Sequence, residues 1–423
     1  MTASRFTSLI RRGAFALSLA GAVAASAAEP ASTHWSPSWM ASTQPIWSGD
    51  FALPPGLPFQ FNRQTVRQVA RLSIGGTRLR VVISNEGGTS PLHIGAAHVA
   101  RHAEGSAIAE GSDRPLRFGG QAEVTVPPGA RLVSDPVDIA LPPLGEVAVS
   151  LYLPRPSQPA GFHFDARQTA YLADGDLTAA PRMPVAASQW STRVYVSGLI
   201  VETQKPPTTV VTLGDSLTDG NGSTPGANTR WPDALAERLA VRDVAVLNAG
   251  ISGGRLLKDG MGRAGLERAG RDVFAQPGVR AMVVLLGTND IGWPGGPFAP
   301  AEPAMRAKEL IQGFRQLIEM AHAHNVRIVA GTIPPNEGAL KGTPLEGHYS
   351  PEKDKVRQAV NRWIRESGAF DALVDFDALL RDPAHPSRLK AAMDSGDHLH
   401  PGDAGYKAMA AAIDLDALLG IAP

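Results

Sequence analysis

The chain has no cysteine among its 423 residues. Disulfide bonds, thiol nucleophiles and cysteine-ligated metal sites are therefore excluded, and the fold has to be stable through its core alone. The chain also lacks an excess of either charge, because Lys plus Arg and Asp plus Glu each number 40. Proteins that bind nucleic acid or anionic membranes favour a basic surplus. We therefore expect no nucleic-acid partner.

Long hydrophobic runs are missing as well, and the most apolar stretch is short and lies near the N-terminus. Residues 13–27 (GAFALSLAGAVAASA) follow a positively charged start and end in the small residues Ala25–Ala27. This pattern is typical of a signal peptide, which we place at 1–28. The Arg11–Arg12 pair leaves both Sec and Tat export open. We expect a periplasmic or secreted protein with no membrane insertion after signal cleavage.

What the chain does have is material for a large core. Hydrophobic residues make up 43% of the sequence and charged residues 19%, so the chain is not disordered by composition. Its length suggests two or three domains. The residue patterns divide it near Lys205–Pro207, and we assign a first domain to 29–204, a linker to 205–209 and a second domain to 210–423.

The first domain shows the period of two that is typical of strands. In 77–83 the apolar residues Leu79, Val81 and Ile83 alternate with arginine, and 146–153 and 193–201 are further strand candidates. Gly75–Gly76 lies between two such runs and predicts a two-residue hairpin. No clear helix pattern interrupts these strands. The region 29–204 therefore predicts an antiparallel β-sandwich of jelly-roll type.

The second domain alternates short apolar runs with helical patterns. Strands are predicted at 210–213, 244–249, 281–287, 327–333 and 372–376, and helices at 231–240, 264–275, 301–324, 351–366 and 402–418. Buried strands joined by crossover helices indicate a five-stranded parallel sheet covered on both faces. Functional residues are expected beyond the carboxyl ends of those strands.

Polar clusters follow the first three strands, and a fourth precedes the last helix. They contain Ser216, the glycine-rich run 248–254, Asn289, and the segment 394–405 with a carboxylate and histidines. Acyl transfer needs such a set, because a serine hydroxyl requires a base, the base requires an orienting group, and the oxyanion requires fixed donors. Asp397 and His400 are close enough in sequence for one turn to join them.

The four clusters resemble the sequence blocks of the SGNH (GDSL) hydrolase family: GDSLTDG, NAGISGG, GTND and DHLHP, in the family's order. The resemblance covers about 208–423. It implies a flavodoxin-like fold, no metal or cofactor, and hydrolysis of carboxylic esters. It also implies roles for five residues. The nucleophile is Ser216, the general base His400, the residue orienting it Asp397, and the oxyanion donors Gly253 and Asn289.

Alternatives remain for some of these roles. Ser252 lies in GISGG, which fits the G-x-S-x-G pattern of an α/β-hydrolase, although that fold places several strands before its nucleophile. His398 is a second imidazole in the last block, and Asp394 is the reserve acid. His163 is either a core residue of the β-region or reaches the active site if the domains pack together.

Other polar residues have ordinary structural interpretations beside functional ones. Arg255 is a surface arginine or a substrate contact, and His322 with His324 is a solvated helix end or part of a metal site. Three tryptophans just after the expected signal peptide are sugar-stacking surfaces, core residues of the sandwich or contacts between domains; they are Trp35, Trp39 and Trp47.

The substrate is predicted only by resemblance. An exported SGNH domain after a β-sandwich is similar to carbohydrate esterases that remove acetyl groups from xylan and related polysaccharides. We therefore expect short acyl groups, with acetyl on carbohydrate first. The alternatives are a lipase or arylesterase of broad specificity, and a carbohydrate-binding protein with an inactive hydrolase domain. The sequence does not indicate the oligomeric state.

Overall fold

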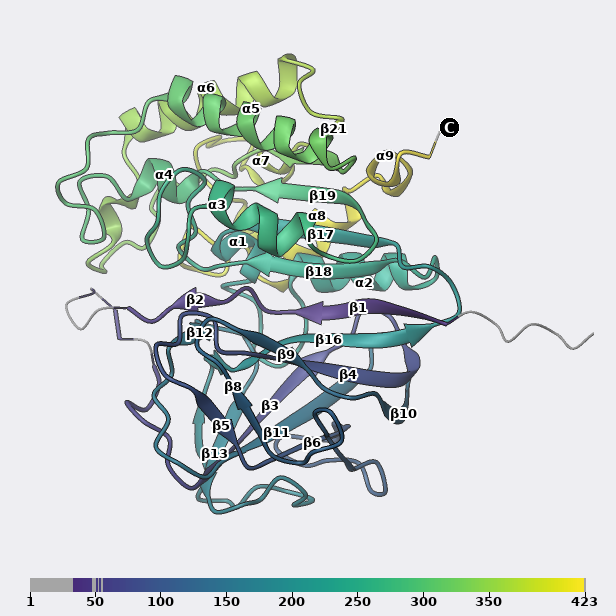
Figure 1. The fold of residues 1–423 in the computed structure, drawn as a ribbon. Coiled ribbons are helices and arrows are strands. Elements are labelled where there is room, and N and C mark those ends of the chain that lie inside the picture. Colours follow the sequence, from purple (N-terminus) through teal and green to yellow (C-terminus); the bar gives the residue numbers. More distant parts are fainter. Residues whose placement is uncertain (1–32, 48–50, 52, 55, 422–423) are drawn as a thin grey trace, which may run out of the picture. The chain divides into compact units, whose positions relative to one another are not determined.

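The computed structural model describes residues 33–47, 51, 53–54 and 56–421 (Figure 1). The expected signal peptide, 1–28, lies outside the described residues. Residues 205–208 of the assigned linker, 205–209, lie between the last strand of the β-region and the first strand of the parallel sheet, and Thr209 already belongs to that strand.

The first domain is built from antiparallel strands in two main sheets. One has the order β1-β16-β4-β10, with β9 also pairing with β4, and the other has the order β14-β13-β3-β11-β6-β7. The first sheet comprises β1 (His34–Met40), β16 (Val196–Thr203), β4 (Gly76–Ser84), β10 (Val137–Leu141) and β9 (Arg131–Val133). The second comprises β14 (Ser188–Trp190), β13 (Ala170–Asp174), β3 (Gln64–Arg71), β11 (Glu146–Leu153), β6 (Ala96–Arg101) and β7 (Arg114–Pro115).

Apolar side chains from the two sheets share one core. Leu79, Val81 and Ile83 of β4 are fully buried in the same cluster as Val147 and Leu151 of β11. Smaller sheets complete the domain: β15 (Arg193–Val194), β12 (Gly161–His163) and β2 (Gln44–Pro45) form one, and β5 (Leu92–Ile94) and β8 (Val124–Val126) another. The prediction of an all-β first domain is confirmed.

The hairpin predicted at Gly75–Gly76 is wrong. The strands on either side, β3 and β4, belong to different sheets, so the chain crosses the sandwich here. A Cβ atom on Gly75 would lie 2.4 Å from the carbonyl oxygen of Leu141, and one on Gly76 would lie 2.6 Å from that of Glu202. The two glycines therefore allow a close approach of backbones and do not form a turn.

The second domain contains a five-stranded parallel sheet, as predicted. Its order is β18-β17-β19-β20-β21, which in chain order is the 2-1-3-4-5 arrangement of flavodoxin-like folds. The strands are β17 (Thr209–Gly214), β18 (Ala245–Gly250), β19 (Val279–Leu285), β20 (Arg327–Gly331) and β21 (Ala372–Val374). The predicted strand positions agree with these bounds to within a few residues.

Helices cover both faces of this sheet, which explains why its strands are apolar throughout. Val211 and Leu213 of β17 pack into one apolar cluster, whereas Val210 packs into the other. The first cluster includes residues of α3 (Gly265–Ala269), the π-helix η1 (Gly270–Phe274), α4 (Thr288–Gly292), α5 (Ala307–Ala323) and α6 (Pro351–Glu366). The second includes residues of α2 (Trp231–Ala240), α7 (Phe376–Leu380), α8 (Asp403–Ala411) and α9 (Leu415–Leu419).

Two predicted helices differ from the observed ones. The segment 301–324 becomes helical only at Ala307, after the chain passes Pro303. The segment 402–418 is divided into α8 and α9, because the carboxylate of Asp414 accepts hydrogen bonds from two backbone amides and starts a new helix. Three short helices remain: α1 (Ser216–Asp219), η2 (Glu346–His348) and η3 (Ala391–Met393).

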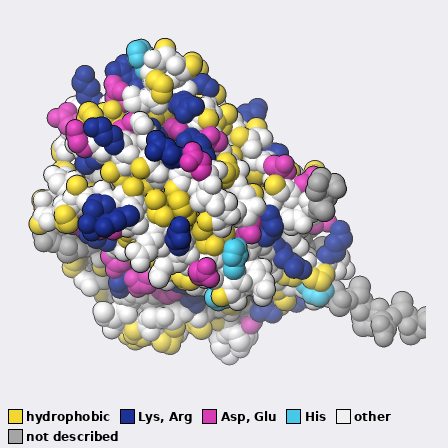
Figure 2. Space-filling view, turned by 90° about the horizontal axis from the view of Figure 1, so that it is seen from above, with side chains coloured by type: hydrophobic (Ala, Val, Ile, Leu, Met, Phe, Trp, Pro, Cys, Tyr) yellow, Lys and Arg dark blue, Asp and Glu magenta, His cyan; other side chains and the backbone are white. Residues whose placement is uncertain are grey.

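The two domains contact each other directly. Strand β1 of the first domain packs beside β18 of the parallel sheet (Figure 1). Arg71 of β3 forms a 2.9 Å ion pair with Glu237 of α2. On the face shown in Figure 2, acidic and basic side chains are interspersed. Among the described helices, none combines the length and apolar character needed to cross a membrane.

Candidate active site

The loop after β17 carries Ser216 at the first position of α1. The residue before it, Asp215, caps this helix by accepting a hydrogen bond from the amide of Leu217 at 3.0 Å. Burial raises the pKa of Asp215 to about 8, and the nearby charge of Asp290 acts in the same direction. Asp215 is therefore held inside the turn as a structural residue, while Ser216 lies on the rim of a cavity.

Ser216, His400 and Asp397 form a continuous hydrogen-bonded chain. The Nε2 atom of His400 lies 2.7 Å from the Oγ atom of Ser216, and its Nδ1 atom lies 2.6 Å from the Oδ2 atom of Asp397. The Asp397 carboxylate can only accept a hydrogen bond, so Nδ1 of His400 carries the hydrogen and Nε2 is left to accept the serine proton. Ser216 and His400 are 184 residues apart in sequence, and the fold brings them together.

The Asp397 carboxylate is held on several sides. Its Oδ1 atom also accepts hydrogen bonds from the backbone amides of Leu399 at 2.9 Å and His400 at 2.8 Å. Burial alone would raise the pKa of Asp397, but the hydrogen bonds and charge of His400 hold it well below its usual range. The group therefore stays an anion, which is the state that orients an imidazole.

The second imidazole and the reserve acid pair with each other instead. The Nδ1 atom of His398 lies 2.6 Å from the Oδ2 atom of Asp394, and the His398 side chain is about half exposed. Neither residue lines the cavity beside Ser216. In an extended segment, His398 and His400 would point to the same side. They do not share a side here, because His398 has a positive φ of 61°.

Gly253 and Asn289 lie on the other side of Ser216, after β18 and β19. Gly253 has a φ of +71°, and within the described chain its amide makes no hydrogen bond. The Nδ2 atom of Asn289 donates to the carbonyl oxygen of Gly254 at 3.0 Å, which leaves its second hydrogen free. Both residues line the cavity. The two groups can donate to an anion that forms there.

His348, which sequence reasoning missed, fixes the carboxamide of Asn289. Its Nε2 atom lies 3.2 Å from the Oδ1 atom of Asn289, and its Nδ1 atom accepts a hydrogen bond from the Nδ2 atom of Asn336 at 3.1 Å. Burial lowers the pKa of His348 to about 3, so the ring is neutral and donates from Nε2. This bond turns the amide oxygen of Asn289 toward His348 and its NH2 group away.

Ser252 does not have the surroundings of a nucleophile. Its hydroxyl donates to the Oδ2 atom of Asp219 at 2.8 Å, and its backbone amide donates to the same oxygen at 2.9 Å. Within the described chain, no histidine forms a hydrogen bond with it. The Asp219 carboxylate, at the end of α1, therefore anchors the residue directly before Gly253.

His163 of the first domain holds this same carboxylate. Its Nε2 atom lies 2.9 Å from the Oδ1 atom of Asp219, and its Nδ1 atom lies 2.9 Å from the carbonyl oxygen of Ser42. Both partners only accept hydrogen bonds, so both ring nitrogens carry hydrogen and the ring is an imidazolium. His163 is therefore a buried contact between the domains, and it does not line the cavity beside Ser216.

A cavity of about 350 Å³ opens beside Ser216 and is lined by both domains. Its apolar wall includes Trp293, Phe298 and Phe164, and its polar side includes Asp165 and Arg167. Among the cavity-lining residues that the structure describes, Trp35, Trp39 and Trp47 do not occur. Trp47 is instead buried in the core of the first domain, where its indole donates to the carbonyl oxygen of Met261 at 2.8 Å.

The remaining candidates do not line this cavity. Arg255 is buried and forms two 3.0 Å hydrogen bonds with Glu302, so it is not a surface arginine. His322 lies 3.1 Å from a carboxylate oxygen of Asp371. Among the described residues, no group of three or more His, Asp or Glu side chains is placed to hold a metal ion.

A parallel sheet in 2-1-3-4-5 order, with serine, glycine, asparagine and histidine at its carboxyl edge, defines the class of SGNH hydrolases. The sequence model of the GDSL-like Lipase/Acylhydrolase family matches residues 212–408. This match covers most of the second domain, which is therefore similar to that family and is the domain of a carboxylic ester hydrolase. The family assignment predicted from the four sequence blocks is confirmed.

Several solved structures are similar to the second half of the chain at low sequence identity. A GDSL-like lipase from Bacteroides thetaiotaomicron is 19% identical, with a TM-score of 0.37 over 50% of this chain and 87% of that one. A carbohydrate acetylesterase family member from Sinorhizobium meliloti is 18% identical, with a TM-score of 0.38 over 50% and 99%. The aryl esterase of M. smegmatis is 15% identical, with a TM-score of 0.39 over 48% and 95%. No curated protein matches the chain.

Proposed function

We propose that the protein hydrolyses carboxylic esters through an acyl-enzyme formed on Ser216. The observation that carries this proposal is the chain of two hydrogen bonds, 2.7 Å and 2.6 Å long, from the serine through His400 to Asp397. His400 takes the serine proton as Oγ attacks the ester carbonyl, and it returns this proton to the departing alcohol. Water then attacks the acyl-enzyme with the same imidazole as base and releases the acid.

Gly253 and Asn289 are proposed to stabilise the negative charge that develops on the carbonyl oxygen. Each has a hydrogen-bond donor with no other partner among the described residues. Donors fixed before the reaction act more strongly than water, because they need no reorganisation as the charge forms. Loss of one such donor costs about 10²–10³ in kcat in well-studied hydrolases.

We propose short acyl groups as the acid part of the substrate, and acetylated carbohydrate such as xylan as the first candidate. Two features of the cavity support this. Its volume of about 350 Å³ is near the lower end of the roughly 300–1,000 Å³ usual for ligand pockets. Its polar side, with Asp165 and Arg167, offers partners for sugar hydroxyls.

A lipase or arylesterase of broad specificity is the second candidate, and the apolar wall favours it. Trp293 and Phe298 lie against each other with ring centroids 4.6 Å apart, and Phe164 lines the same cavity. Such a wall accepts an aromatic leaving group or a longer acyl chain as readily as acetyl.

Hydrolysis of p-nitrophenyl esters of increasing acyl length separates these candidates. We expect acetyl or propionyl esters to have the highest kcat/KM, and acetylated xylan to release acetate. A preference for long chains would replace this proposal with the second candidate. Ser216→Ala is expected to lower kcat by about 10⁴-fold or more, whereas the matched Ser252→Ala leaves most of it. Equal losses in the two variants would contradict the assignment of the nucleophile.

The proposed location is the periplasm or the cell exterior, and it rests on the signal peptide that the sequence predicts at 1–28. Labelling with a fluorophosphonate probe in cell fractions tests location and mechanism together. We expect a labelled band in the periplasmic or extracellular fraction that is missing in Ser216→Ala. Absence of labelling in the wild type would favour an inactive, carbohydrate-binding protein.

A further inference from the structure

Arg193 is a buried cation with an unusual position between the two domains. It lies in β15 directly opposite His163 of β12, so the two side chains are on the same face of this small sheet. Only 5% of Arg193 is exposed to solvent. Its guanidinium carbon lies over the indole of Trp39, 4.7 Å from the ring centroid. The guanidinium carries five N–H donors.

These N–H groups have no partner in the described chain: no hydrogen bond or ion pair joins the Arg193 side chain to a described residue. A buried guanidinium is costly unless its charge is paired and its donors are used. Arg67, in the same domain, shows the usual solution, because it is fully buried and donates to five oxygen atoms. Arg193 therefore requires a partner that the side chains around it do not supply.

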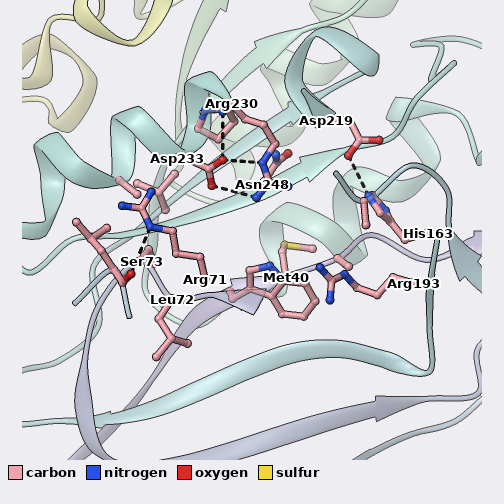
Figure 3. Close-up of a pocket in the computed structure, with 17 residues that line it drawn as sticks. Met40, Arg71, Leu72, Ser73, His163, Arg193, Asp219, Arg230, Asp233 and Asn248 are labelled. Atoms are coloured by element: carbon pink, nitrogen blue, oxygen red, sulfur yellow. Dashed lines mark hydrogen bonds and ion pairs between the residues drawn. The ribbon is translucent and has the colours of Figure 1, made fainter. Parts of the chain in front are cut away.

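The unused donors belong to a residue that lines a small cavity between the domains (Figure 3). The cations around it are Arg71, Arg193, Arg230 and His163, and the carboxylates are Asp219 and Asp233. Both carboxylates are already engaged. Asp219 binds His163 and Ser252, and Asp233 forms a two-pronged contact with Arg230. In Figure 3 no dashed line reaches Arg193. The cavity therefore carries an excess of positive charge.

We propose that this cavity binds one small monovalent anion, chloride, held by the guanidinium of Arg193. The cavity measures about 30 Å³, and one water needs at least about 10–15 Å³ on the same measure. One chloride ion fits, whereas a phosphate or an organic acid does not. Water alone would satisfy donors but would leave the charge of Arg193 beside two other cations.

The electrostatics of Arg193 agree with this assignment. Burial lowers its pKa to about 9, and the charge of Arg230 adds to the effect. An anion would offset both costs. It would also reduce the repulsion between Arg193 and His163, which share one sheet face. Since His163 holds Asp219, and Asp219 anchors the loop before Gly253, the anion would stabilise the contact between the domains.

Thermal unfolding tests the proposal when sodium chloride replaces sodium gluconate stepwise, so that the ionic strength stays constant and the chloride concentration rises. We expect the Tm of the full-length wild type to rise by about 2 °C or more and then saturate, because chloride binds only the folded state. In Arg193→Met, which fills similar space without donors, the rise should vanish. The control variant Arg263→Gln removes a half-exposed arginine, and its Tm should still rise with chloride as in the wild type. Equal Tm values of the wild type in both salts would overturn the proposal.

Diffraction from wild-type crystals grown with bromide gives a result that does not depend on any variant folding. Bromide replaces chloride and scatters anomalously. We expect an anomalous peak in the cavity, within about 3.5 Å of the guanidinium nitrogens of Arg193. A cavity that contains only water under these conditions would overturn the proposal, whatever the behaviour of Arg193→Met.

Discussion

At the scale of single residues, His348 is the clearest case of a side chain that acts through another. It touches Asn289 rather than the reacting serine, and its ring packs closely on α4: a Cβ atom on Gly292 would lie 2.3 Å from its Nε2 atom. Without this ring the carboxamide of Asn289 can rotate. We expect His348→Ala to lower kcat by about 10–100-fold with little change in KM, because a misdirected oxyanion donor weakens only the transition state.

His348→Gln is the conservative variant, because its amide can still donate to Asn289 and accept from Asn336. We expect it to recover most of the lost kcat. Initial rates with p-nitrophenyl acetate give kcat and KM, and thermal unfolding shows whether each variant remains folded. If folded His348→Ala keeps full kcat, the ring has no positioning role.

The sequence motifs predicted five site residues, and all five line one cavity in the structure. They are Ser216, Gly253, Asn289, Asp397 and His400. His348 could not be predicted in this way. It lies in the long loop after β20, in a stretch without a motif, and its importance arises only from contact with a residue 59 positions away. Likewise, the pattern HLH could not show which imidazole faces Ser216, because this depends on the backbone angle at His398.

At the scale of elements, the loop after β18 depends on the backbone of Gly253. Its positive φ is unfavourable for any residue with a side chain. A Cβ atom there would also lie 2.2 Å from the Sδ atom of Met261 and 2.8 Å from the ring of Trp293. We expect Gly253→Ala to lower kcat by about 10²-fold, because the loop must shift its amide away from the cavity.

Gly270→Ala provides the matched control. Gly270 begins the π-helix with an ordinary helical φ of −55°, and a Cβ atom there meets nothing within 4 Å. We expect this variant to keep both kcat and Tm. Steady-state rates and thermal unfolding of the two glycine variants should therefore differ clearly. Similar activity in both would mean that the conformation at Gly253 is not needed for catalysis.

Elements whose physical cause is local were predictable, and those set by distant contacts were not. The strands of the parallel sheet are apolar on both faces because helices cover both, so their sequence alone marks them. The paired glycines at Gly75–Gly76 have the local pattern of a turn, but backbone from β10 and β16 packs against them. The break between α8 and α9 depends on one capping carboxylate, Asp414, within an otherwise helical pattern.

At the scale of the whole molecule, the β-domain directly contacts the loops around the proposed active site. Gln44 and Trp47 both donate to the carbonyl oxygen of Met261 at 2.8 Å, and Met261 lies next to Gly253. His163 holds Asp219 from the same domain. These contacts join residues 56 to 217 positions apart, so neither periodicity nor motifs could predict them. The β-domain therefore helps to hold the loops around the proposed active site and is not only an appended module.

The buried pair of His163 and Asp219 should make the stability of the protein depend on pH. Burial alone would lower the pKa of His163, but the Asp219 carboxylate and the Ser42 carbonyl raise it above the ordinary 6.5. Arg193 opposes this rise, and Asp165 also faces the ring. Because the folded pKa is raised, the stabilisation is complete below about pH 6.5 and is lost as the pH rises through the folded value.

His163→Gln keeps a donor toward Asp219 but has no charge, so it removes this pH dependence. We expect the wild type to exceed the variant in Tm by about 2–4 °C near pH 6, and the difference to shrink toward pH 9. Asp215, with its pKa raised to about 8, titrates in the same window and with the same sign, but it is present in both proteins and cancels in the difference. A Tm difference that stays constant from pH 6 to 9 would show that His163 is neutral at all these pH values, and its two hydrogen bonds could then not both exist as the distances indicate.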